Sequence, residues 1–137
     1  MKQGMYGGRE RSVTRLPNDP SAVPTARRFA SQAVASYGGN AEVLDKTRLL
    51  VTELTTNAVL HAHSPIRLSV EPLQDAVRIE VRDDDPSPLQ PPCRPDPEAT
   101  SGRGLWLVSS LARSWGVNRN EKGKTVWFEV DGVAPAY

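Results

Sequence analysis

The chain has little of what marks several large classes of protein. Its 137 residues carry a formal net charge of only +1, so no broad basic field indicates direct binding to nucleic acid. No apolar run approaches the roughly 20 residues of a membrane-spanning helix, and the N-terminal MKQGMYGGRERS lacks the apolar segment of a secretory signal. One cysteine, Cys93, cannot form an internal disulfide, which fits a reducing cytoplasm. We therefore expect a cytoplasmic protein with no membrane partner.

Common catalytic and metal-binding motifs are also scarce. His61 and His63 are the only histidines, and residues two apart do not share a helical face, so a zinc pair is not expected. The GxSxG elbow of a serine hydrolase is absent. Lys122-Gly-Lys-Thr-Val126 is not a P-loop, because it lacks the upstream glycine of GxxxxGK[ST].

The length and a hydrophobic fraction of 38% suit one domain with one core. Residues 1–11 are rich in glycine and polar side chains, so we expect a flexible arm there. The folded domain is expected over residues 12–131, followed by a C-terminal tail at 132–137.

Hydrophobic periodicity predicts three helices and five strands. Their order is strand, two helices, two strands, one helix and two strands, which differs from the alternation of a doubly wound fold. It predicts an α+β two-layer sandwich, in which a mixed, mainly antiparallel sheet carries helices on one face. The predicted strands cover residues 12–16, 66–70, 77–81, 115–118 and 125–130, and the predicted helices cover 25–37, 41–61 and 102–114.

Capping and turn residues support these boundaries. Asn40 can cap the second helix, and the glycines at 38–39 are typical of the end of the first. Asn18, Asp19 or Ser21 can cap the first helix. The apolar stripe expected to face the core from the second helix consists of Val43, Leu44, Leu50, Val51, Leu54 and Ala58.

The span 84–101 holds six of the twelve prolines, which exclude a helix or a central strand. A long loop of this kind in a small domain is usually a lid, a binding loop or disorder.

The second predicted helix carries Glu53, Asn57 and His61 at intervals of four residues. Side chains at this spacing lie about 5–6 Å apart at Cβ, so Glu53 and Asn57 can reach one small object between them. An amide oxygen can bind Mg²⁺, which often completes its shell with water and phosphate. A nearby carboxylate can take a proton from a hydroxyl or water. The alternative is an exposed helix face with ordinary polar residues.

Two further features lie on either side of the proline-rich span. Asp83 stands at the end of a predicted strand, where it can accept a hydrogen bond from a base or simply cap a turn. Ser101-Gly-Arg-Gly-Leu105 opens a helix, so its glycines and free N–H groups form a possible phosphate site, or a hinge. Arg103 can add a charge-assisted contact, and Thr125 starts the last strand.

The order of these motifs resembles the nucleotide-binding domain of the GHKL (histidine kinase-like) ATPase superfamily, shared by type II topoisomerases, histidine kinases and mismatch-repair ATPases. ELTTNAVLHA, SGRGLWLV and GKTVWFEV are most similar to its anti-sigma factor branch, the serine-protein kinases of bacterial partner switching. The resemblance covers roughly residues 11–130 and implies the Bergerat-type two-layer fold.

The resemblance implies roles for individual residues. Glu53 matches the catalytic acid, Asn57 the magnesium ligand and Asp83 the acid that reads the adenine amino group. Gly102 and Gly104 match the lid glycines beside the phosphates, and Thr125 matches a residue near the adenine. The full set expected to bind ATP and Mg²⁺ is Asn57, His61, Asp83, Asp85, Ser101, Gly102, Arg103, Gly104, Leu105 and Thr125.

One difference from the family's motifs distinguishes two hypotheses about function. The family's DxGxG motif reads Asp83-Asp-Asp85-Pro-Ser87 here, so both glycines are missing. The favoured hypothesis is an ATP-dependent kinase that phosphorylates a serine of an anti-sigma factor antagonist or sequesters a sigma factor, with a homodimer possible from the resemblance. The alternative is a binding module of the same fold that has lost catalysis. A histidine kinase catalytic domain is disfavoured, because the chain is too short to add a phosphoacceptor hairpin.

Overall fold

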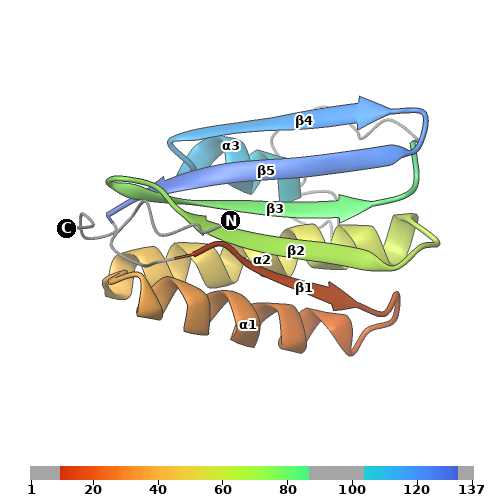
Figure 1. Ribbon diagram of the computed structural model, residues 1–137. Coiled ribbons are helices and arrows are strands. Elements are labelled where there is room, and N and C mark those ends of the chain that lie inside the picture. The colour runs from red at the N-terminus through yellow and green to blue at the C-terminus, as the bar shows by residue number, and fades with distance from the viewer. Residues whose placement is uncertain (1–9, 87–103, 133–137) are drawn as a thin grey trace, which may run out of the picture.

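The structure is a computed structural model that describes residues 10–86 and 104–132. Its elements follow the predicted order (Figure 1). Residues 102–103, at the predicted start of the third helix, and the proline-rich span beyond Pro86 lie outside the described residues, as does Cys93. The elements are β1 (Ser12–Leu16), α1 (Ala22–Ser36), α2 (Ala41–His61), β2 (Ile66–Pro72), β3 (Ala76–Asp83), α3 (Gly104–Leu111), β4 (Ser114–Asn120) and β5 (Gly123–Asp131).

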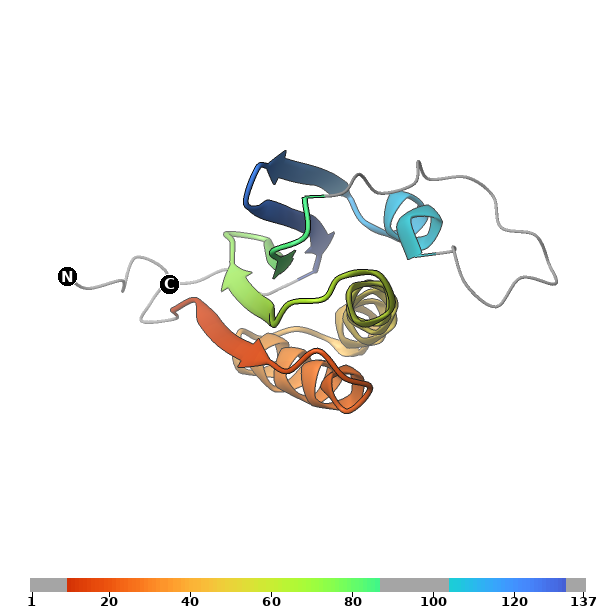
Figure 2. The ribbon, with the colours of Figure 1, turned by 90° about the vertical axis from the view of Figure 1, so that its right-hand side faces the viewer.

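The five strands form one sheet in the order β1-β2-β3-β5-β4. Each pairing between these strands is antiparallel, so the expected mixed sheet is in fact antiparallel throughout the described residues. Figure 2 shows α1, α2 and α3 on one side of the sheet, which confirms the α+β two-layer arrangement. The opposite side, called here the helix-free face, carries none of the described helices.

The core lies between the helices and one face of the sheet. Alternate residues of β3 and β5 point into it, among them Ile79 and Phe128, which are fully buried. The predicted stripe of α2 is confirmed, although Leu44 is only partly buried. None of the described helices is long and apolar enough to cross a membrane.

The helix ends follow local chemistry. Asn40 caps α2, where its Oδ1 accepts the Val43 N–H at 3.0 Å. After α1, Gly38 adopts a positive φ of 91°, which glycine tolerates best. Helix α1 starts at Ala22, three residues earlier than predicted, because Pro24 fits a first turn where no N–H is needed.

Helix α3 ends earlier than predicted. It stops at Leu111, and β4 already begins at Ser114. The backbone N–H of Arg113 donates to the Glu129 carbonyl at 2.9 Å, so pairing with β5 takes over where the helix would continue. Sheet formation therefore sets this boundary, which helical periodicity alone does not show.

Candidate functional site

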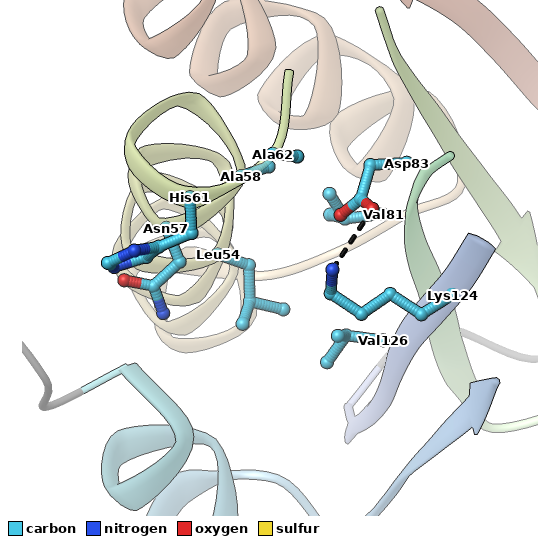
Figure 3. Close-up of a pocket in the computed structure, with 9 residues that line it drawn as sticks. All are labelled: Leu54, Asn57, Ala58, His61, Ala62, Val81, Asp83, Lys124 and Val126. Carbon is cyan, nitrogen blue, oxygen red and sulfur yellow. Dashed lines mark hydrogen bonds and ion pairs between the residues drawn. The ribbon is translucent and has the colours of Figure 1, made fainter. Parts of the chain in front are cut away.

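A pocket lies between the C-terminal half of α2 and the adjoining ends of β3 and β5 (Figure 3). Helix α2 contributes Asn57 and His61, which are one turn apart and lie side by side. Because the same helix buries Leu54 and Ala58 against the sheet, its packing fixes how these polar side chains are presented. This wall therefore combines an amide and an imidazole with an apolar floor.

The sheet supplies the facing wall. Asp83, the last residue of β3, is paired in register with Lys124, the second residue of β5. Both side chains point to the helix side of the sheet, as Val81 and Val126 do. The pairing of two central strands thus places a carboxylate and an ammonium group side by side at the pocket.

Asp83 and Lys124 form a buried ion pair. The distance from Lys124 Nζ to Asp83 Oδ1 is 3.1 Å, and each side chain is only 5% exposed. Lys124 Nζ also donates to the Asp85 carbonyl at 2.8 Å, and Asp83 Oδ1 accepts the Asp85 N–H at 2.8 Å. Both charges are therefore satisfied inside the protein, as buried charges need to be.

Gly123 allows this close approach. It has a φ of 152°, and a Cβ added there would lie 2.2 Å from the Asp83 carbonyl oxygen. Any side chain at Gly123 would push β5 away from the end of β3. The glycine of the GKT stretch thus serves the pairing that brings Lys124 to Asp83.

A second tie holds the end of α2. Asn18, in the loop after β1, donates from Nδ2 to the carbonyls of Ala62 at 2.9 Å and Ser64 at 2.8 Å. Ser64 Oγ in turn accepts the N–H of Asp84 at 2.9 Å. Asn18 was expected as a possible cap for α1, but it closes α2 instead. The segments that follow α2 and β3 are therefore joined beside the pocket.

The predicted site residues are only partly brought together. Asn57, His61 and Asp83 line the pocket, and Asp85 borders it through its backbone contacts with Asp83 and Lys124. Glu53 lies one turn before Asn57 on α2 and is half-buried, but it is not among the described residues that line the pocket.

The remaining predicted residues lie elsewhere. Thr125 follows Lys124, so its side chain lies on the helix-free face, where Arg82 Nη1 donates to its Oγ1 at 3.3 Å. Gly104 and Leu105 start α3, of which only the backbone is described at these positions. Ser101, Gly102 and Arg103 lie outside the described residues.

The site predicted from the sequence did not include Lys124. Val126, Phe128 and Val130 alternate along the last strand and are buried. The same alternation places Lys124 on the core side and Thr125 on the other side. The alternation could therefore have identified Lys124 from the sequence. A lysine is rarely buried, however, so its position is easily read as lying outside the strand.

The polar groups of the pocket are suited to a nucleotide. Asn57 offers an amide oxygen to a metal, and Asp83 offers an acceptor to an amino group. Within the described residues, no cluster of three His, Cys, Asp or Glu side chains could hold a metal. The cavity measures about 20 Å³, which is enough for a water, and Lys124 is one of the residues that line it.

Comparison with known proteins gives a family and a fold. The model of the histidine kinase-like ATPase domain family matches residues 16–130. No curated protein matches the sequence. Among solved structures, the chain is similar to the crystal structure of the RsbU and RsbW domains of Rv1364c from Mycobacterium tuberculosis, with a TM-score of 0.70 and 17% identity. The similarity covers 92% of this chain and 33% of that chain, so this chain spans about a third of its neighbour.

Proposed function

Because this chain belongs to the histidine kinase-like ATPase domain family, we propose that it is an ATP-binding regulatory protein of the anti-sigma factor serine-kinase type. The observation that carries the proposal is the convergence of Asn57 and Asp83 on one pocket from opposite walls. Helix α2 supplies the first and β3 the second, so the site depends on the tertiary fold rather than on one segment.

Each residue has a chemical role in this proposal. The Asn57 amide oxygen is suited to Mg²⁺, and the Asp83 carboxylate is suited to the amino group of adenine. Glu53, one turn from Asn57, would accept the proton of a serine hydroxyl on the protein substrate. ATP, when bound, supplies the phosphoryl group.

Lys124 adds a condition for nucleotide binding that the family resemblance alone does not suggest, namely that its ion pair with Asp83 must open. Its ammonium group already pairs with Asp83, the carboxylate that would otherwise be offered to the adenine amino group. Lysine has a long flexible side chain, so Lys124 can swing toward bound phosphates or solvent and leave Asp83 to the base. Nucleotide binding would then compete with an internal ion pair, which lowers the apparent affinity.

The proposed partners are an anti-sigma factor antagonist and a sigma factor. Support comes from the motifs ELTTNAVLHA and SGRGLWLV and from the similarity to a structure that contains an RsbW domain. The resemblance to anti-sigma factor kinases also leads us to propose a cytoplasmic location.

A second candidate function is a binding module without catalysis. Two observations favour it: the buried pair of Lys124 with Asp83, and Asp85 and Ser87 where the family's motif has glycines. In that case the ion pair is a permanent structural element, and the partner surface alone carries the function.

Calorimetric titration with ATP, with and without Mg²⁺, separates the two candidates. We expect the parent to bind, and Asn57→Ala to bind roughly tenfold more weakly only when Mg²⁺ is present, because a metal ligand is lost. Glu53→Ala should bind like the parent but fail to transfer phosphate to a serine substrate. Asn120→Ala, which removes an exposed amide outside the pocket, is the control. A parent that binds no nucleotide would favour the silent module.

A further inference from the structure

Three arginines lie next to one another on the helix-free face. Register pairs Arg15 of β1 with Arg67 of β2, and Arg67 with Arg82 of β3. Alternation puts all three on the face away from the core, since Leu16, Ile66, Leu68, Val81 and Asp83 occupy the buried positions beside them. We call Arg15, Arg67 and Arg82 the arginine row. The same line continues through Thr125 of β5 and Asn118 of β4, which carry no charge.

No carboxylate neutralises the arginine row within the described part of the chain. Arg82 donates to the hydroxyl of Thr125 at 3.3 Å, and none of the three makes an ion pair with a described residue. Arg15 and Arg67 are exposed, and Arg82 is half-buried. The row therefore presents three positive charges toward solvent.

Two other arginines, Arg78 of β3 and Arg113 just before β4, form ion pairs with carboxylates. Arg78 binds Glu80 at 3.0 Å and Glu129 at 3.1 Å, and it stacks over the Trp127 ring at 4.0 Å. Burial opposes the charge of Arg78, but these two carboxylates hold its pKa above the ordinary value. Arg113 likewise contacts carboxylates, among them Asp131 at 2.7 Å. Arg78 and Arg113 thus have carboxylate partners, whereas the arginine row and Arg119 of β4 have none among the described residues.

The arginine row is not expected to stabilise the fold. Like charges directly opposite one another on neighbouring strands are destabilising. A bound anion would remove this repulsion, and the planar guanidinium group is well shaped to hold a carboxylate through two hydrogen bonds. The arrangement is thus better explained by a ligand than by packing.

We propose that the arginine row is a docking site for a short acidic segment of a partner protein. The row is about 10 Å long, because it spans two spacings between neighbouring strands. Several carboxylates of a protein segment that crosses the strands can each meet one guanidinium group. Thr125 and Asn118 extend the line with groups that can bind the backbone of such a segment.

The charge pattern around the row favours a protein segment over nucleic acid. Along β3, Glu80 lies two residues before Arg82 on the same face, and Asp84 lies two residues after it and is exposed. The positive region is therefore only one residue deep in the strand direction. A nucleic acid backbone is a continuous polyanion that would extend over these carboxylates.

A fluorescent peptide of alternating glutamate and glycine is a suitable probe, read by anisotropy. We expect the parent chain to bind it, with affinity that falls as salt rises, and to ignore the same peptide with glutamine. Arg15→Ala/Arg67→Ala should bind about tenfold more weakly, since two charge-assisted contacts are lost. The control Arg28→Ala/Arg119→Ala removes the same charge at two exposed positions away from the arginine row and should bind like the parent.

Three results would overturn the proposal. One is equal loss of peptide binding in both double variants, which would show a response to net charge alone. Another is a parent chain that does not distinguish the glutamate from the glutamine peptide. The third is tighter binding of a short DNA duplex that depends on Arg15 and Arg67. Melting temperatures of the two variants at or above that of the parent exclude misfolding as the cause. ATP is absent from these measurements, so the result is independent of the proposed nucleotide site.

Discussion

At the scale of the residue, the buried ion pair of Lys124 with Asp83 is the main charged feature of the pocket wall. The Lys124 ammonium group contacts only one carboxylate and one carbonyl among the described groups. A buried pair of this kind adds little net stability compared with an apolar pair of the same size. It does, however, make each partner depend on the other, since either charge alone would be buried without compensation.

Lys124→Met tests this dependence. Removal of the ammonium group leaves the Asp83 carboxylate buried and uncompensated, so the free energy of unfolding should fall by about 3–5 kcal/mol. The double variant Lys124→Met/Asp83→Leu should recover most of that loss, because both charges are gone. Urea denaturation measures both, with the exposed Lys122→Met as control. Additive losses in the double variant would show that the two side chains are not coupled.

At the scale of the element, α2 is held at both ends by asparagines. Asn40 caps its start within the same segment, a local interaction that sequence patterns indicate well. Its end is held by Asn18, more than forty residues earlier, which donates to the carbonyls of Ala62 and Ser64 just beyond the helix. Asn57 and His61 lie in this last part of α2, so Asn18 supports the pocket from outside it.

Asn18→Asp keeps the size of the side chain but removes its N–H donors. We expect a loss of about 1–3 kcal/mol in the free energy of unfolding, because carbonyls at the end of α2 lose their partner and face a negative charge. Amide exchange should also become faster near Asn57 and His61. Asn120→Asp is a matched control, since Asn120 uses its oxygen as an acceptor for the Lys122 N–H at 2.8 Å. Equal effects of the two changes would contradict the role of Asn18.

At the scale of the whole molecule, the two faces of the sheet differ in purpose. The helices cover one face of the sheet (Figure 2), and the pocket lies on that side. The helix-free face carries the paired charges around Trp127 together with the arginine row. Two separate sites on opposite faces of one sheet would allow a partner to bind without blocking the pocket. Such an arrangement suits a regulatory protein that recognises another protein.

Arg67→Gln tests whether the arginine row strains the fold. Arg67 is the middle member, so its replacement removes both cross-strand repulsions, each worth a few tenths of a kcal/mol. The melting temperature should stay equal or rise at low salt, and the difference from the parent should shrink at high salt. Arg78→Gln is the opposite case, because Arg78 is paired and its loss should lower stability. A clear loss of stability in Arg67→Gln would show that the row has partners that hold the fold together.

Sequence periodicity alone determined the number, order and type of the elements, and it placed Glu53, Asn57 and His61 on one helix. These features depend on contacts within about one or two helical turns or on alternation along one strand, which the sequence displays directly. The predicted boundary between α3 and β4 was less accurate, because pairing of β4 with β5 determines where the helix ends.

Only the tertiary structure decided which residues of different strands meet. Alternation assigns a residue to one of two faces, but register determines its neighbour across the sheet, and register depends on the packing of the whole domain. For this reason the ion pair of Lys124 with Asp83, the position of Thr125 away from the pocket and the alignment of Arg15, Arg67 and Arg82 appear only in the fold.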